Sequence, residues 1–163
     1  MEQNLAMEQN WRHLPSPARP IAAAACVAVE AAQRRDEQAL AAAADDLAAL
    51  DPARTGLVLG TLVRVLLEDS HPAGLDGEAV RAVLERGVRS AAVWQPEVDP
   101  HVMLFLVAGA LGVTDEDDDT PPPKPDVLAR HAALLTADLL GPRPVPLFLE
   151  ATFVEIERTQ LND

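Results

Sequence analysis

The residues best placed by type and spacing to hold a metal ion are Glu68 and His71, within the segment Glu68-Asp69-Ser70-His71. On a helix this spacing places a carboxylate and an imidazole on one face, as in the di-iron sites of helical bundles. Those sites need a second such pair and further inward-facing glutamates, whereas this sequence contains one pair. Pro72 follows directly, so we expect His71 at a helix end, where an imidazole interacts favourably with the helix dipole. The sequence therefore favours a polar helix end, with no metal or other cofactor.

Four further side chains are candidates for lining a small-ligand pocket. Pockets of this kind are mostly apolar and aromatic, with a few polar groups that orient the ligand. Trp94 and Phe105 would form the wall of such a pocket, and His101 and His131 would supply its polar contacts. The alternative is that these residues pack within the fold, with His131 as a hydrogen-bonded core imidazole. Both interpretations remain open on the sequence.

No catalytic motif is present in the sequence, and we assign no catalytic residue. None of the three serines lies in a Gly-x-Ser-x-Gly turn, and neither glycine-rich phosphate-binding pattern occurs. Cys26 lies among alanines with no basic neighbour, which favours a small buried side chain over a nucleophile. A triad assembled from distant parts of the chain stays open, because triads are spatial arrangements. The sequence nevertheless favours a non-enzymatic protein.

The acidic block at 115–119 is followed by three consecutive prolines. A calcium-binding EF-hand loop needs acidic residues at alternate positions, a central glycine and a closing glutamate, and this block has none of that spacing. A charge block next to polyproline is typical of a solvated segment. We therefore expect a mobile acidic and proline-rich loop at about 114–125.

The elements that must position these residues are helices. Alanine and leucine dominate the apolar residues, and both are strong helix formers. Aspartates that can cap a helix precede several apolar segments, twice with proline at the next position. The helices expected from these signals are 21–35, 36–50, 52–69, 78–93, 100–113, 126–141 and 145–161. The fold class predicted is all-α, a compact bundle or array of about six to seven helices.

Two of the predicted helices, 52–69 and 100–113, are apolar nearly all round and are expected at the centre of the fold. The apolar run at 102–113 has twelve residues, which is too short for a bilayer core of about 30 Å. It is therefore interpreted as a buried helix, with its middle at the middle of the core, or as an oligomer interface.

Two regions make up the predicted domain organisation. Residues 1–20 are expected to form a flexible N-terminal arm, because three prolines in its second half prevent a continuous helix. This arm would be ordered only where Trp11 and Leu14 find a groove. Residues 21–163 are expected to form a single helical domain, which is a typical size for one domain.

The charge balance limits the kinds of partner. The formal net charge is −13, from 26 acidic and 13 basic residues. Such a chain is repelled by nucleic acid backbones and by anionic membrane surfaces, so neither is expected as a partner. A single cysteine excludes an internal disulfide and is typical of a reducing compartment, which predicts a cytoplasmic location.

Two functional hypotheses follow from the sequence. The first is a non-enzymatic protein–protein interaction module, acting as a scaffold or regulatory protein and binding a protein partner or itself, with a homodimer expected. The alternative is a helical sensor that binds a small molecule in an internal apolar pocket.

Overall fold

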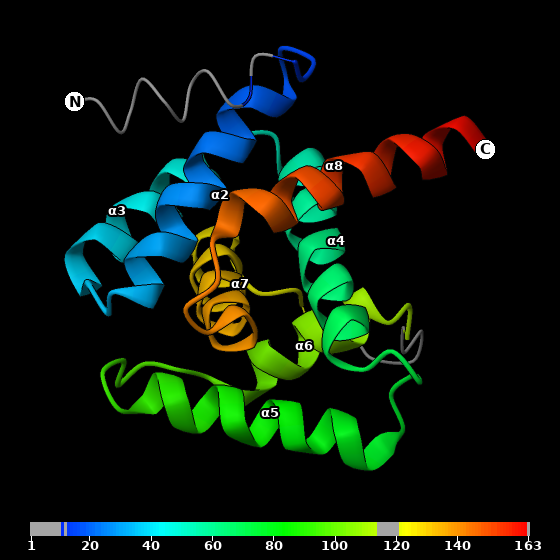
Figure 1. Cartoon of the computed structure of the whole chain (residues 1–163). Helices are drawn as coiled ribbons and strands as arrows, with labels where there is room; N and C mark the ends of the chain where they lie inside the picture. The colour runs from blue at the N-terminus through cyan, green and yellow to red at the C-terminus, as the bar shows by residue number, and fades with distance from the viewer. Residues whose placement is uncertain (1–10, 12, 114–120, 163) are drawn as a thin grey trace.

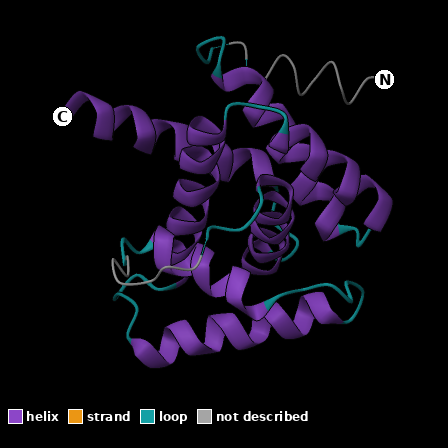
Figure 2. Ribbon diagram, turned by 180° about the vertical axis from the view of Figure 1, so that it is seen from behind, coloured by secondary structure: helices purple, strands orange, loops and turns teal. Residues whose placement is uncertain are grey.

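The computed structural model describes residues 11, 13–113 and 121–162, and these form an array of helices (Figures 1 and 2). No described residue lies in a β-strand, so the all-α prediction is confirmed. The helices are α2 (Ala18–Gln33), α3 (Glu37–Ala48), α4 (Pro52–Ser70), α5 (Gly77–Ala92), α6 (Pro100–Ala110), α7 (Pro125–Leu140) and α8 (Val145–Asn162). None of these helices is both long and apolar enough to cross a membrane.

Four helices begin where the sequence places an aspartate cap. Each aspartate accepts a hydrogen bond from a backbone N–H of the first turn, which satisfies a donor that has no partner inside the helix. The pairs are Asp36 with Ala39 (3.1 Å), Asp51 with Arg54 (3.0 Å), Asp76 with Ala79 (2.8 Å) and Asp99 with His101 (2.9 Å). Helices α4 and α6 then carry proline in the first turn, where no N–H is needed.

The N-terminal boundary differs from the sequence expectation. Helix α2 begins at Ala18 and includes Pro20, because a proline in the first helical turn costs no hydrogen bond. Before it, Trp11 is 1% exposed and its ring lies 6.3 Å from that of Phe153 on α8, while Leu14 is also buried. Trp11 and Leu14 therefore pack into the fold. This is the condition under which the sequence predicted that the segment would be ordered. Residues 1–10 and 12 lie outside the described part of the chain, as do residues 114–120 of the predicted acidic loop.

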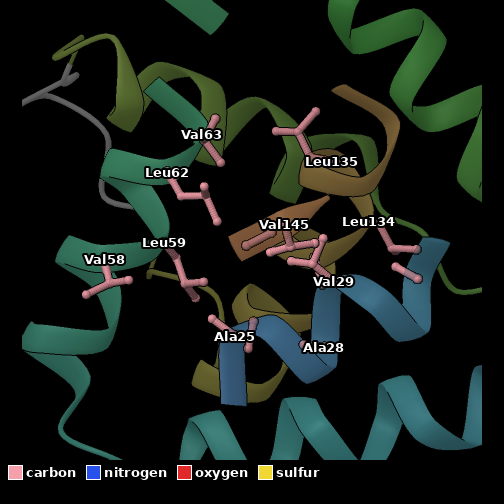
Figure 3. Packing of buried hydrophobic residues seen from close by; sticks show 14 of the residues in the cluster. Ala25, Ala28, Val29, Val58, Leu59, Leu62, Val63, Leu134, Leu135 and Val145 are labelled. Atoms are coloured by element: carbon pink, nitrogen blue, oxygen red, sulfur yellow. The ribbon is translucent and has the colours of Figure 1, made fainter. Parts of the chain in front are cut away.

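Helix α7 is at the centre of the array. It packs against α2, α3, α4, α5 and α6, and Figure 1 shows it nearly end-on in the middle of the molecule. Figure 3 shows side chains of α2, α4 and α7 converging around Val145 at the start of α8. Several alanines of α2 and α3, among them Ala25 and Ala44, are fully buried and let these two helices pack closely.

Helix α6 differs from the expectation that its middle would be the middle of the core. It packs on α4, α5 and α7 through one face, which includes the fully buried Met103 and Val107. Leu104 and Phe105, on the other side of the helix, are 48% and 47% exposed. The expectation failed because a helix that is apolar all round is buried only if neighbours surround it, and the described neighbours of α6 lie on one side.

Arg35 is the one non-glycine residue with a positive φ, 56°, in the described part of the chain. It ends α2 in a Schellman arrangement, in which the Asp36 N–H donates to the Ala31 carbonyl at 2.9 Å and the Arg35 N–H to the Ala32 carbonyl at 3.1 Å. Glycine usually occupies this position, because a Cβ is disfavoured in the left-handed region.

Replacing Arg35 with glycine should therefore raise the free energy of unfolding by about 0.5–1 kcal/mol, since it relieves the left-handed conformation. Urea denaturation monitored by circular dichroism would measure the change. Arg34→Gly is the matched control, because Arg34 has an ordinary helical φ of −85° and glycine there should destabilise. If the two variants lose stability equally, the conformation of Arg35 is not strained.

Candidate functional site

His131 is a buried imidazole that joins α7 to the start of α6. Its side chain is 3% exposed, and its Nε2 accepts a hydrogen bond from the Asp99 backbone N–H at 2.9 Å. Because Nε2 accepts, the ring proton is on Nδ1, which donates to the Val127 carbonyl oxygen at 2.8 Å. Both ring nitrogens are thus engaged by the backbone, which leaves neither of them for a ligand.

The surroundings of His131 keep the ring neutral. Burial lowers the pKa of His131 below its ordinary value, because the charged form loses its water. Arg130 acts in the same direction, whereas the Val127 carbonyl and the Asp99 carboxylate oppose it without overcoming the effect of burial. The neutral form is also the only one in which Nε2 can accept the Asp99 hydrogen bond.

The other three candidate pocket residues do not meet His131 in one internal cavity. Trp94 follows the end of α5 and lines a recess at the molecular surface, together with residues of α2 and α7. His101 and Phe105 lie four residues apart on α6, and both are exposed. The structure thus brings His101 and Phe105 to one helix face and places Trp94 and His131 elsewhere.

The recess beside Trp94 has a volume of about 220 Å³, below the roughly 300–1,000 Å³ typical of small-molecule sites. Gln33 and Asp138, two of its polar side chains, already have partners within the fold. Gln33 Nε2 donates to the Gly141 and Arg143 carbonyl oxygens, both at 2.9 Å, and Asp138 pairs with Arg86 at 3.2 Å. These contacts tie the C-terminal end of α2 and the middle of α5 to the C-terminal end of α7.

Glu68 and His71 lie at the C-terminal end of α4, as the sequence indicated. His71 is the C-cap residue, and its Nδ1 lies 3.1 Å from the Leu67 carbonyl oxygen. Glu68 is exposed and 3.9 Å from Arg64, on the preceding turn. Within the described residues there is no group of three or more histidine, cysteine, aspartate or glutamate side chains that could hold a metal ion.

Cys26 is fully buried, and its Sγ donates a hydrogen bond to Glu30 Oε1 at 2.8 Å. Burial raises the pKa of Cys26, and the Glu30 carboxylate raises it further by accepting from the thiol and repelling a thiolate. The side chain is therefore a protonated thiol without nucleophilic character.

The outer face of α6 is one of the exposed apolar surfaces of the described chain, and Leu147 and Val154 on α8 are exposed as well. We define the outer face of α6 as Leu104, Phe105, Ala108, Gly109 and Val113. Val113, just past the helix end, is 64% exposed, and Leu104 and Phe105 are about half exposed. No aspartate, glutamate, lysine or arginine occurs from residue 100 to residue 113. The signal for this face in the sequence is that the apolar run covers all sides of the helix, which is more than one buried face requires.

Comparison with protein families, with curated proteins and with solved structures gives no match for this chain.

Proposed function

We propose that this chain is a non-enzymatic protein–protein interaction module, acting as a scaffold or regulatory protein and assembling as a homodimer. The observation that supports this most is the outer face of α6, an exposed apolar surface on a helix without a charged residue. Charged residues are depleted and large apolar residues enriched at the centres of protein interfaces. The titratable groups described above have their hydrogen-bond and ion-pair partners within the fold. Contact with another protein is therefore the role best supported.

The overall charge limits which faces of the chain can meet in an assembly. Two copies of a chain with a net charge of −13 repel one another, and the repulsion is smallest where neither copy presents an acidic side chain. The exposed face of α3, by contrast, carries Glu37, Asp45 and Asp46. The outer face of α6 itself carries no acidic side chain, although Asp99 precedes the helix and the acidic block 115–119 follows Val113, and its apolar side chains gain from being removed from water.

The alternative proposal, a small-molecule sensor, has the recess beside Trp94 as its support. That recess is small and open at the surface, and it is not the internal apolar pocket that this hypothesis requires. We therefore prefer the interaction module.

Replacing Leu104 and Phe105 together with glutamine should abolish self-association while leaving the helical fold intact, because both side chains are half exposed in the single chain. Sedimentation velocity would measure self-association. The protein concentration should range from about 1 to 500 µM, because an interface built on one short helix is small and therefore weak. Val93→Gln is the matched control, because Val93 is 70% exposed and lies outside the α6 face.

Affinity capture with the wild type and the double variant extends this test to other proteins. If the double variant assembles and captures the same proteins as the wild type, the outer face of α6 is not an interaction surface and the proposal is wrong.

A further inference from the structure

The connection between α5 and α6, residues 93–99, is attached to α7 by two polar contacts. Its last residue, Asp99, donates its backbone N–H to His131 Nε2 at 2.9 Å. Glu97 pairs with Arg130 at 3.5 Å, but the Glu97 side chain is 82% exposed, so water and salt screen this ion pair. The hydrogen bond between Asp99 and His131 is therefore the stronger of the two contacts.

The rest of the connection contributes little that would keep it closed. Gln95 is its one buried side chain, and Trp94 and Val98 are only half-buried. Among the described residues, Gln95 Nε2 has no hydrogen-bond partner. A buried amide donor without a partner costs free energy, which solvation would recover if the connection opened. A segment with few buried apolar contacts opens more readily than the core helices do.

Asp99 also fixes the start of α6. Its carboxylate accepts a hydrogen bond from the His101 N–H at 2.9 Å, and its carbonyl oxygen accepts one from the Val102 N–H at 3.1 Å. Its own N–H is the group that reaches His131. The imidazole thus holds both the connection and the first turn of α6 against α7.

We infer that the hydrogen bond between Asp99 and His131 is a proton-sensitive latch, and that protonation of the ring releases residues 93–99 from α7 while the core helices stay folded. Nδ1 already carries a proton, so a proton from solvent can add only to the lone pair of Nε2. Both ring nitrogens are then donors. The Nε2–H and the Asp99 N–H face each other without an acceptor, and the hydrogen bond is lost.

The charged groups around His131 leave this response to the ring itself. Of the described residues, Asp99 before α6 and Arg130 on α7 are the charged groups that act on the ring. They oppose one another, because the carboxylate favours the protonated form and the guanidinium disfavours it. The charged side chains of the other helices around α7 are exposed or have partners elsewhere, among them Glu30 with Cys26, Arg64 with Glu155, Asp69 with Arg143 and Arg86 with Asp138.

The direction of the response follows from burial. Burial lowers the pKa of His131 while the latch is closed, whereas an opened ring regains its ordinary pKa of about 6.5. The open form therefore binds the proton more readily. The latch stays closed above about pH 6.5, and it opens increasingly as the pH falls towards the lowered pKa. Within that window each pH unit shifts the opening equilibrium by up to about tenfold.

Amide hydrogen exchange of the full chain, followed by NMR between pH 8 and pH 5, tests the latch. Rates are corrected for the intrinsic effect of pH on exchange. We expect the Asp99 amide to be less protected than the Leu66 amide in the core of α4, and its protection to fall by up to about tenfold per pH unit below pH 6.5. Low concentrations of urea should hardly change the protection of Asp99, because local opening exposes little surface.

Two histidine variants assign the response. His131→Gln should remove the pH dependence of Asp99 protection, because glutamine does not titrate. His101→Gln is the matched control and should retain it, since His101 is exposed and lies two residues from Asp99. If His131→Gln does not fold, the urea dependence of exchange in the wild type still tests the latch.

Either of two results would overturn the inference. If Asp99 and Leu66 have equal protection and respond equally to urea, the His131 hydrogen bond breaks only on global unfolding and there is no latch. If the pH dependence of Asp99 persists in His131→Gln, another group causes it. Both results are independent of whether the chain self-associates, so they leave the proposed function to its own test.

Discussion

Replacing Leu66 with alanine should lower the free energy of unfolding by about 2–5 kcal/mol. Leu66 is fully buried on α4, the helix that packs against α6, α7 and α8 in the core. The loss combines the transfer free energy of the removed methyl groups with the cavity left behind, because close-packed helices relax only in part. Urea denaturation at a protein concentration low enough to keep the chain monomeric would measure it.

Leu104→Ala is the control for this substitution, since it removes the same atoms from a side chain that is 48% exposed. We expect a loss below about 1 kcal/mol there, because little buried surface or cavity is involved. Leu106 is half-buried and should fall between the two. Equal losses at positions 66 and 104 would contradict the assignment of α6 to the edge of the core.

The stability of the protein should decrease as the pH is lowered through about 6.5, because of His131. The pKa of His131 is lowered in the folded state, so the unfolded chain binds the proton more readily. Its contribution to stability is therefore complete above the unfolded pKa and is lost as the pH falls from there towards the folded pKa. The slope from one such group is at most about 1.4 kcal/mol per pH unit.

His131→Gln isolates this contribution. At pH 7.5 we expect a loss of about 1–3 kcal/mol, because the Asp99 N–H and the Val127 carbonyl lose buried partners. The difference between wild type and variant should then shrink as the pH is lowered to about 5.5, where the wild type is penalised for binding a proton. His101→Gln is the control, since His101 is exposed and this variant still contains the buried imidazole of His131. A difference that stays constant from pH 8 to pH 5.5 would show that His131 does not titrate in this range.

Local signals were enough to predict the helices and where most of them begin. An aspartate cap acts within one turn, so Asp36, Asp51, Asp76 and Asp99 identify helix starts without any knowledge of the fold. Gly141 likewise ends α7 in a positive-φ conformation, close to the predicted end. Boundaries set by contacts a few residues apart are readable from the sequence.

Features set by distant residues were not predictable in the same way. The central position of α7 depends on five neighbouring helices, and its pattern of apolar residues gives no information about which helices these are. The hydrogen bond between Asp99 and His131 joins positions 32 residues apart, so the sequence could place His131 in the core without naming its partner. The outer face of α6 could be proposed as an interface, but periodicity cannot decide which half of an apolar helix is covered.

The central position of α7 also bears on how the chain is synthesised. Helices α2 to α6 precede α7 in the sequence and pack around it, so a ribosome makes them before the helix that completes their core. At a translation rate of roughly 5–20 residues per second, α7 is completed several seconds after α3 and α4, and their apolar faces lack this neighbour until then. The alanine-rich pair α2 and α3 can associate early, because its contacts are local in the sequence. The contacts that α4, α5 and α6 make with α7 can form only after translation has passed Leu140, so the nascent chain exposes these apolar faces until then.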